Sequence, residues 1–317
     1  MHDPARAQHR TVAAPFPLPD WIVDYIKDDF LIVGEGSDTT QAEAMLVTGT
    51  HPIDAALLAG FPALKYICCL GSGYEGVDAR HAGQSGIVVS NSARVTDEDV
   101  ADHLVGLFLA LCCRIPWHDE AIRAGNWAKP MRRSIRELKV GIFGLGAIGQ
   151  ATASRLAPFG PEIRWTGPRQ KPAGYPFVQS LADLASWADA LFVCARADDT
   201  NIGLIDGAIF DRLGPEGVVL NVSRGSILDE DALIDALRAG RLGGAALDVF
   251  QEEPTPAARW QNVPNIILSP HVGGYATGVR RGIQQLVHRN LTAFFAGAAV
   301  AGVVAPVPEE LLHATAR

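Results

Sequence analysis

The segment from Lys139 to Gly149 constrains the fold of this chain more than any other stretch. It reads KVGIFGLGAIG, so that a short apolar run leads directly into three spaced glycines. The apolar run predicts a buried parallel strand, and Gln150 to Leu156 predicts a helix after it. In such a unit the first glycine permits a tight turn, the second admits a pyrophosphate, and the third lets helix and strand pack closely. The helix N-terminus then favours the phosphates. We therefore predict a dinucleotide site formed by Gly144, Leu145, Gly146, Ala147, Ile148 and Gly149.

The composition limits the partners that the chain can have. With 317 residues, 48% of them apolar and 20% charged, the sequence predicts a soluble protein with two domains. The net charge of −8 argues against nucleic acid or an anionic membrane as a partner, because either would require a basic face. A small acidic substrate would then need local arginines.

The cysteines and the N-terminus indicate where the protein resides. The five cysteines fall as two adjacent pairs and one single residue, which fits neither a metal site nor a disulfide framework. The first ten residues lack the apolar core of a signal peptide, and no stretch approaches the roughly 20 apolar residues of a membrane helix. We expect a cytoplasmic protein with buried, reduced thiols and no metal.

Short apolar runs alternate with helical segments along most of the chain. This alternation predicts an α/β fold of two doubly wound parallel sheets, Rossmann-like or flavodoxin-like, with a cleft between the domains. The expected strands are 31–33, 44–47, 65–70, 87–90, 140–143, 162–166, 190–194, 217–222, 244–250 and 266–268. The expected helices are 21–28, 53–59, 97–113, 150–156, 232–239 and 280–296, the last crossing back to the first domain. Segment 115–137 fits an excursion or an oligomer contact, although one of its arginines could also reach an active site.

The turn after the second strand of the nucleotide domain bears on the choice of cofactor. NAD-binding proteins place a carboxylate there for the adenosine ribose, but this chain has Gly167, followed by Pro168, Arg169, Gln170 and Lys171. A guanidinium can bind the 2′-phosphate of NADP bidentately, whereas an Asp would repel it. The turn therefore favours NADP over NAD, the alternative being an exposed basic turn without a ligand.

Three strand ends of the same domain present Arg224, Glu253 and His271. These residue types suit the reduction of a 2-oxo acid. An arginine can bind the carboxylate and polarise the carbonyl, and a histidine can give a proton to the oxygen as hydride reaches carbon. A carboxylate beside the histidine favours its protonated form. A lone histidine after a proline is more often structural, so the prediction depends on the combination.

Four segments together resemble the signatures of the D-isomer-specific 2-hydroxyacid dehydrogenases, in particular the branch of glyoxylate/hydroxypyruvate reductases. They are the glycine motif at 144–149, Asn221 to Gly225, Leu247 to Pro254, and Ser269 to Gly274. Their order and separations also fit, and the resemblance runs from about Leu64 to Gly297.

The resemblance implies a role for each matching residue. Arg224 would bind substrate, His271 would be the acid/base and Glu253 its partner, while Ser72 and Gly73 would offer backbone N–H groups to the substrate carboxylate. From the residues alone, the loop that holds Ser72 fits either an anion site or a structural turn. The positions expected to contact the cofactor besides the glycine motif are Thr96, Val100, Gly167, Arg169, Cys194, Ala195, Val222, Asp248 and Gly273. Asp248 would contact the nicotinamide amide.

The resemblance also implies a domain organisation and a reaction. Both chain ends, 1–97 and 285–317, would form the substrate domain, residues 98–284 the dinucleotide domain, and two chains would form a homodimer through the nucleotide domain. The expected reaction is NAD(P)H-dependent reduction of a small 2-oxo acid to the D-2-hydroxy acid. One alternative is an NAD-linked dehydrogenase of the phosphoglycerate type, and another is a non-catalytic dinucleotide-sensing regulator. Arg196 departs from the family pattern, and the sequence assigns it no role.

Overall fold

The computed structural model describes residues 10–34 and 36–304, and these residues form two units. One unit combines the described residues up to Thr96 with those from Thr277 onward, and the other runs from Asp97 to Ala276. The expected absence of a signal peptide concerns the first ten residues, of which 1–9 lie outside the described residues, as do residues 35 and 305–317.

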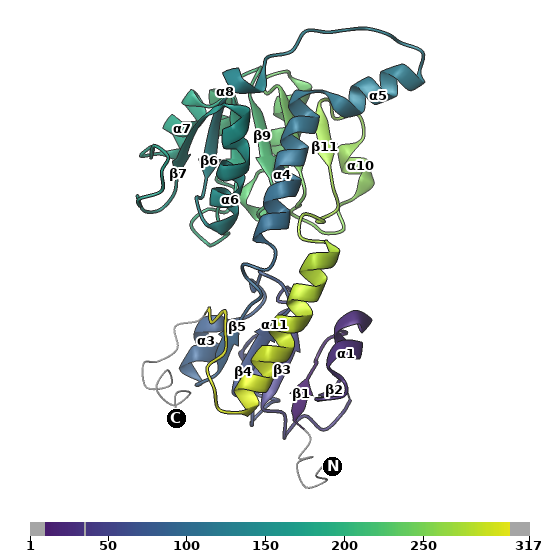
Figure 1. Cartoon of the computed structure of the whole chain (residues 1–317), viewed down its shortest axis with the longest axis vertical. Coiled ribbons are helices and arrows are strands. Elements are labelled where there is room, and N and C mark those ends of the chain that lie inside the picture. The colour runs from purple at the N-terminus through teal and green to yellow at the C-terminus, as the bar shows by residue number, and fades with distance from the viewer. Residues whose placement is uncertain (1–9, 35, 305–317) are drawn as a thin grey trace. The chain divides into compact units, whose positions relative to one another are not determined.

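The first unit contains a parallel sheet of five strands in the order β2-β1-β3-β4-β5. Its strands are β1 (Thr11–Ala13), β2 (Leu31–Val33), β3 (Ala44–Val47), β4 (Tyr66–Cys69) and β5 (Val88–Ser90). Its helices are α1 (Asp20–Ile26), α2 (Ala55–Leu58), α3 (Ala79–Gln84) and α11 (Thr277–Phe295). The C-terminal helix α11 therefore shares this unit with elements from the start of the chain (Figure 1).

Strand β4 shows why this sheet is covered on both faces. Ile67 and Cys69 point into one apolar cluster, whereas the ring of Tyr66 stacks on Phe294 of α11 at 5.0 Å between centroids. The Tyr66 hydroxyl shares a 2.6 Å hydrogen bond with Ser90, so its buried polar end is satisfied. Two opposite apolar faces on one short strand are typical of a parallel sheet between helices.

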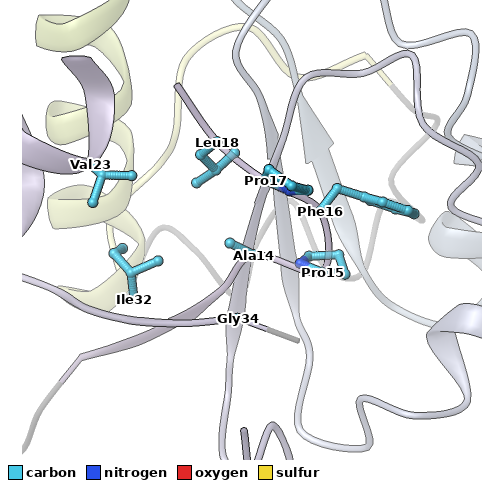
Figure 2. A pocket seen from close by; sticks show the side chains of 8 residues that line it. All are labelled: Ala14, Pro15, Phe16, Pro17, Leu18, Val23, Ile32 and Gly34. Atoms are coloured by element: carbon cyan, nitrogen blue, oxygen red, sulfur yellow. The ribbon is translucent and has the colours of Figure 1, made fainter. Parts of the chain in front are cut away.

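An apolar hollow of about 240 Å³ lies beside the segment that follows β1 (Figure 2). Phe16, Leu18, Val23 and Ile32 supply most of its side-chain lining, and none of its lining residues is charged. A site for an acidic substrate needs charged or hydrogen-bonding groups, so this hollow does not supply the chemistry predicted from the sequence.

The second unit contains a parallel sheet of six strands in the order β11-β10-β9-β8-β6-β7. Its strands are β6 (Lys139–Phe143), β7 (Glu162–Thr166), β8 (Ala190–Val193), β9 (Val218–Asn221), β10 (Gly244–Leu247) and β11 (Ile266–Leu268). Its α-helices are α4 (Asp97–Cys112), α5 (Ile115–Arg123), α6 (Ala147–Leu156), α7 (Leu181–Trp187), α8 (Gly207–Leu213), α9 (Glu230–Arg238) and α10 (Ala257–Trp260). Short 3₁₀ turns occur at Ile135–Glu137, Ala157–Phe159 and Gly225–Ile227.

Helices also cover both faces of this larger sheet (Figure 1). Leu191 and Val193 of β8 point into one apolar cluster, and Phe192 points into the other. There the ring of Phe192 meets Phe108 of α4 edge to face, with centroids 5.1 Å apart. Helix α4 packs against α6 and the strands β9, β10 and β11. The predicted pair of parallel-sheet α/β domains is confirmed, while the cleft between them stays a prediction.

Several boundaries differ from those expected, and each difference has a local cause. The helix expected at 53–59 begins only at Ala55, because the Asp54 side chain accepts a hydrogen bond from Leu57 N and caps it. The three-residue β1 and the short α3 carry no local signal strong enough to predict them. The chain was expected to return to the first unit between residues 284 and 285, but it does so at Thr277, where α11 begins.

Among the described residues, no single helix is long and apolar enough to cross a membrane. Helices α4 and α5 together pass the same test of length and composition, with a bend of 54° between them.

Candidate active site

The glycine loop joins β6 to α6, as its sequence predicts, and it lies against the end of β8. Gly144 has a φ of +94°, and a side chain there would meet the backbone N and Cα of Ala195 at 2.4 Å. A side chain at Gly149 would meet the carbonyl oxygen of Gly144 at 2.3 Å. Both positions therefore exclude any residue larger than glycine, one through backbone conformation and contact, the other through contact alone.

Gly146 provides a test of whether the loop fits a dinucleotide. A Cβ added at this glycine would meet no described atom within 4 Å, so packing within the protein does not require glycine here. Gly146 is also the residue that immediately precedes α6, where helix N–H groups are available to an anion. Open space at a helix N-terminus is what a pyrophosphate needs, and the loop accordingly fits the cofactor.

The basic turn after β7 lies beside the same loop. The ammonium group of Lys171 donates a 2.5 Å hydrogen bond to the carbonyl oxygen of Leu145, within the glycine loop. Gly167 follows β7 directly, and Arg169 is exposed. The turn is thus attached to the loop that would bind the pyrophosphate, and Gly167 leaves the expected carboxylate position without an acid.

The predicted catalytic residues follow three neighbouring strands of this sheet. Arg224 follows β9, Glu253 lies in the segment after β10, and His271 follows β11. These strands are adjacent and parallel, so their carboxyl ends lie at one edge of the sheet. Ligands of open α/β sheets bind at this edge.

His271 and Glu253 form a direct pair. The imidazole Nδ1 lies 2.7 Å from Oε2 of Glu253, and the side chains are 45% and 38% exposed. The other oxygen of Glu253, Oε1, accepts a 3.0 Å hydrogen bond from Phe250 N, which fixes the carboxylate. Because Nδ1 is engaged by the carboxylate, Nε2 is the ring atom left to exchange a proton with a substrate.

Arg224 lies in a turn that packs on the segment leading to Glu253. A side chain at Gly225, the next residue, would meet the backbone carbonyl carbon of Phe250 at 1.9 Å, so the two backbones are in contact. The buried Asn221 donates from its amide to the carbonyl oxygen of Arg224 at 2.9 Å, and it accepts a hydrogen bond from Ser223 N. The backbone that carries Arg224 is therefore fixed from both sides.

A buried carboxylate supports the segment before Glu253. Glu230, 2% exposed, accepts a 2.6 Å hydrogen bond from Gln251 N and a 2.8 Å hydrogen bond from Nε of Arg259. Arg259 also pairs with the exposed Asp231 at 2.8 Å. The guanidinium compensates the charge that Glu230 brings into the interior.

Asp248 supports the segment that carries His271. Its carboxylate, 2% exposed, accepts hydrogen bonds from Ser269 Oγ at 2.6 Å, Val272 N at 3.0 Å and Gly273 N at 2.8 Å. Burial by itself would raise the pKa of Asp248, but the imidazole of His103, 3.3 Å away, and these hydrogen bonds outweigh it, and the pKa lies below its ordinary value. Asp248 is therefore ionised at neutral pH, with much of its hydrogen-bonding capacity already used.

The other predicted positions divide between the two units. In the first unit, Ser72 and Gly73 follow β4, and the carbonyl oxygen of Ser72 accepts a hydrogen bond from Asn91 Nδ2. The remaining cofactor positions belong to the second unit, except Thr96, which ends the first unit and has a buried hydroxyl with no hydrogen-bond partner among the described residues. Cys194 and Ala195 follow β8, Val222 follows β9, and Val100 lies on α4 close to Gly273.

Four supporting residues were not predicted, namely His103, Ser269, Glu230 and Arg259. His103 carried a usable signal, because it is a polar residue on the apolar face of α4, between the buried Val100 and Leu107. Glu230 had none, since a glutamate in the first turn of a helix is ordinarily exposed.

Comparisons with known proteins identify the family of this chain. A family model described as D-isomer specific 2-hydroxyacid dehydrogenase, NAD binding domain, matches residues 105–273. A glyoxylate/hydroxypyruvate reductase of Arabidopsis thaliana is 34% identical over 261 residues, which cover 81% of each chain. A hydroxyphenylpyruvate reductase of Plectranthus scutellarioides is 36% identical over 248 residues, which cover 77% of this chain and 79% of that protein.

A solved structure extends the similarity to the fold. The NADPH-dependent glyoxylate/hydroxypyruvate reductase of Sinorhizobium meliloti, in complex with NADP and malonate, matches with a TM-score of 0.87 and 31% identity. The match covers 95% of this chain and 98% of that one. This chain therefore belongs to the D-isomer-specific 2-hydroxyacid dehydrogenases, and its reaction is the NAD(P)H-dependent reduction of a 2-oxo acid.

Proposed function

We propose that the protein is an NADPH-preferring reductase that converts a small 2-oxo acid, such as glyoxylate or hydroxypyruvate, to the D-2-hydroxy acid. The observation that carries this proposal is the 2.7 Å pair of His271 and Glu253 at the strand ends, beside the turn that holds Arg224. Relatives named for glyoxylate, hydroxypyruvate and hydroxyphenylpyruvate reduction support the substrate class.

The catalytic residues divide the work between charge and proton transfer. Arg224 binds the substrate carboxylate and polarises the carbonyl, so that the carbonyl carbon becomes more electrophilic. The bound nicotinamide cofactor supplies the hydride. His271 gives a proton from Nε2 to the carbonyl oxygen, which becomes the hydroxyl, while Glu253 holds Nδ1 and stabilises the imidazolium that is present before the transfer.

The remaining site residues have binding roles in this proposal. Ser72 and Gly73 would bind the substrate carboxylate through backbone N–H groups, and Asp248 would hold the nicotinamide amide. The glycine loop at 144–149 binds the pyrophosphate, supported by its open helix N-terminus. The other residues that would contact the cofactor are Thr96, Val100, Cys194, Ala195, Val222 and Gly273. The unpartnered hydroxyl of Thr96 supports its place in this list.

The preference for NADPH rests on the turn after β7. Gly167 stands where NAD-binding proteins carry the carboxylate that would hold the ribose, and Lys171 holds the basic turn against the glycine loop, with Arg169 exposed. A guanidinium there can bind the 2′-phosphate that distinguishes NADPH from NADH. The related NADPH-dependent reductase of Sinorhizobium meliloti supports the same preference.

Initial rates with glyoxylate, hydroxypyruvate and hydroxyphenylpyruvate, each with NADPH and with NADH, test this function. We expect kcat/KM to favour NADPH by more than about tenfold, which corresponds to roughly 1.4 kcal/mol. Arg169→Ala should remove most of this preference, because it weakens the binding of NADPH and leaves that of NADH unchanged. Arg164→Ala is the matched control, because Arg164 lies within β7 and pairs with Glu162, and it should keep the preference. A wild-type preference for NADH would contradict the role of Arg169, and no turnover of any 2-oxo acid would contradict the function.

Two further properties belong to this proposal. We propose that the protein forms a homodimer through α5 and segment 124–134, which extend away from the six-stranded sheet (Figure 1). Ile115, Ile122, Trp127 and Met131 of this region are 55%, 50%, 73% and 96% exposed, and apolar side chains gathered at a surface mark protein contacts. A cytoplasmic location is supported by the five cysteines, all of which are free thiols.

A further inference from the structure

His271 has a backbone conformation that the surrounding structure must hold in place. Its φ of +52° lies in the left-handed region, which is uncommon for residues other than glycine. Asp248 contacts the segment on both sides of this residue. The carbonyl oxygen of Asp248 accepts a 2.8 Å hydrogen bond from His271 N, and its carboxylate accepts from the next two backbone N–H groups, those of Val272 and Gly273. The position of the imidazole therefore depends on the position of Asp248.

A second histidine, His103 of α4, contacts the same carboxylate. Its Nε2 lies 2.9 Å from Ser269 Oγ and 3.3 Å from Asp248 Oδ1, and its side chain is 26% exposed. The single hydroxyl proton of Ser269 is donated to Asp248, 2.6 Å away. Ser269 Oγ must then accept the proton of His103, so Nε2 of His103 carries the hydrogen and donates it. The hydrogen bonds run in one direction, from the helix to the serine and on to the carboxylate.

We propose that His103 is a positioning residue for His271, an inference that rests on the proposed role of His271 as the acid/base. The N–H of His103 fixes Ser269, and Ser269 fixes the Asp248 carboxylate that holds residues 271–273. Helix α4 packs on β10 and β11, the strands that carry Asp248 and the His271 segment, so the helix provides a rigid origin for this chain of hydrogen bonds. A site built in this way aligns its proton donor through the supporting residues.

A packing role for His103 is the competing explanation. A Cβ at Gly273 would meet Cδ2 of His103 at 3.5 Å, so the ring also fills space under the His271 segment. The two roles make different predictions. A packing residue can be replaced by an apolar side chain of similar bulk, whereas a hydrogen-bond donor can be replaced only by another donor.

The experiment compares His103→Leu, which keeps bulk without a donor, with His103→Gln, whose amide N–H can take the place of the Nε2 donor. Measured with NADPH and the best 2-oxo acid from the panel, kcat of His103→Leu should fall about tenfold, because a hydrogen bond in a network with a charged group is lost. The KM should change less than kcat. His103→Gln should recover most of kcat. His288→Leu is the matched control, since His288 pairs with Asp29 on the first unit at 2.8 Å, and it should leave kcat within about twofold of wild type.

A second measurement does not depend on turnover. Hydrogen exchange of the peptide covering 269–276 should be faster in His103→Leu than in wild type and near wild type in His103→Gln, because the amides of 272 and 273 lose their fixed acceptor. Ser269→Ala should have the same effect as His103→Leu, and combining the two should add no further loss of kcat, since both remove one hydrogen-bond chain.

Several results would overturn the proposal. These are a kcat for His103→Leu within about twofold of wild type, a His103→Gln variant as slow as His103→Leu, or additive effects of the two substitutions. If His103→Leu fails to fold, Ser269→Ala decides alone, and an unchanged kcat and exchange rate in that variant reject the idea. A wild-type protein without activity would contradict the proposed function, while the exchange measurement would still decide whether His103 holds the segment.

Discussion

The segment that carries Glu253 and the segment that carries His271 are both held by a buried carboxylate, but the two carboxylates are compensated differently. Glu230 binds Gln251 N and faces the guanidinium of Arg259 at 2.8 Å. Among the described residues, the hydrogen-bond donors to the Asp248 side chain are a hydroxyl and backbone N–H groups, with an imidazole 3.3 Å away.

This difference separates stability from alignment. A guanidinium attracts a carboxylate over a range of geometries, so the Glu230 pair tolerates small movements and contributes mainly to folding. Dipolar donors act only when they are aligned, so the Asp248 network fixes positions more strictly. The stricter support lies under His271, the residue proposed to deliver a proton to one atom of the substrate, and the more tolerant support lies under its partner Glu253.

Removing the proposed acid/base gives the largest expected effect and tests the distinction between the two segments most directly. His271→Ala should lower kcat by about 10²- to 10⁴-fold, because the variant loses the proposed proton donor and Glu253 does not replace it at the carbonyl oxygen. The dissociation constant of NADPH, measured by fluorescence titration, should change little. A variant that retains most of its kcat would remove His271 from proton transfer.

Replacing the partner should have a smaller effect. Glu253→Gln keeps an oxygen near Nδ1 of His271 but removes its charge, and a hydrogen bond to a charged group is worth roughly 1.5–3 kcal/mol. Because both side chains are about 40% exposed, solvent reduces this value, and we expect kcat to fall about tenfold. The measurement is the steady-state kcat of Glu253→Gln, and the control is Glu252→Gln, a substitution at the exposed residue next to Glu253. A loss as large as that of His271→Ala would mean that both segments require equally strict alignment.

The smallest effect on turnover is expected at Glu230, where the loss should appear in stability. Glu230→Ala leaves Gln251 N without its acceptor and Arg259 without its buried partner, which should lower the free energy of unfolding by roughly 2–4 kcal/mol in urea denaturation. Asp231→Ala removes only the exposed partner of the same arginine and should cost less than about 1 kcal/mol. Equal losses of unfolding free energy in the two variants would show that the burial of Glu230 adds nothing to the stability of the protein.

Local sequence was sufficient for the parts of this molecule that depend on neighbours in the chain. The apolar run before Gly144 and the spacing of the three glycines predicted β6, the loop and α6, and the structure confirms that unit. The short elements were harder, because a three-residue strand such as β1 gains its order from β2 and β3 on either side of it. The start of α11 at Thr277 likewise has no strong local signal.

The candidate site divides in the same way. The pairing of Glu253 with His271 followed from residue types at strand ends and from the resemblance of the flanking segments, and the 2.7 Å contact agrees with it. The supporting network did not follow, because Ser269 lies 166 positions from His103 along the chain.

The sequence by itself therefore determined the α/β class, the glycine loop and the strand-end positions of the predicted catalytic residues, because each is encoded by a few consecutive side chains with fixed chemistry. The tertiary structure decided which groups hold those residues in place. Contacts such as that of His103 with Ser269 form only when α4 packs on β10 and β11. A hydrogen bond between residues so distant in sequence is set by the packing of whole elements, and no local pattern records it.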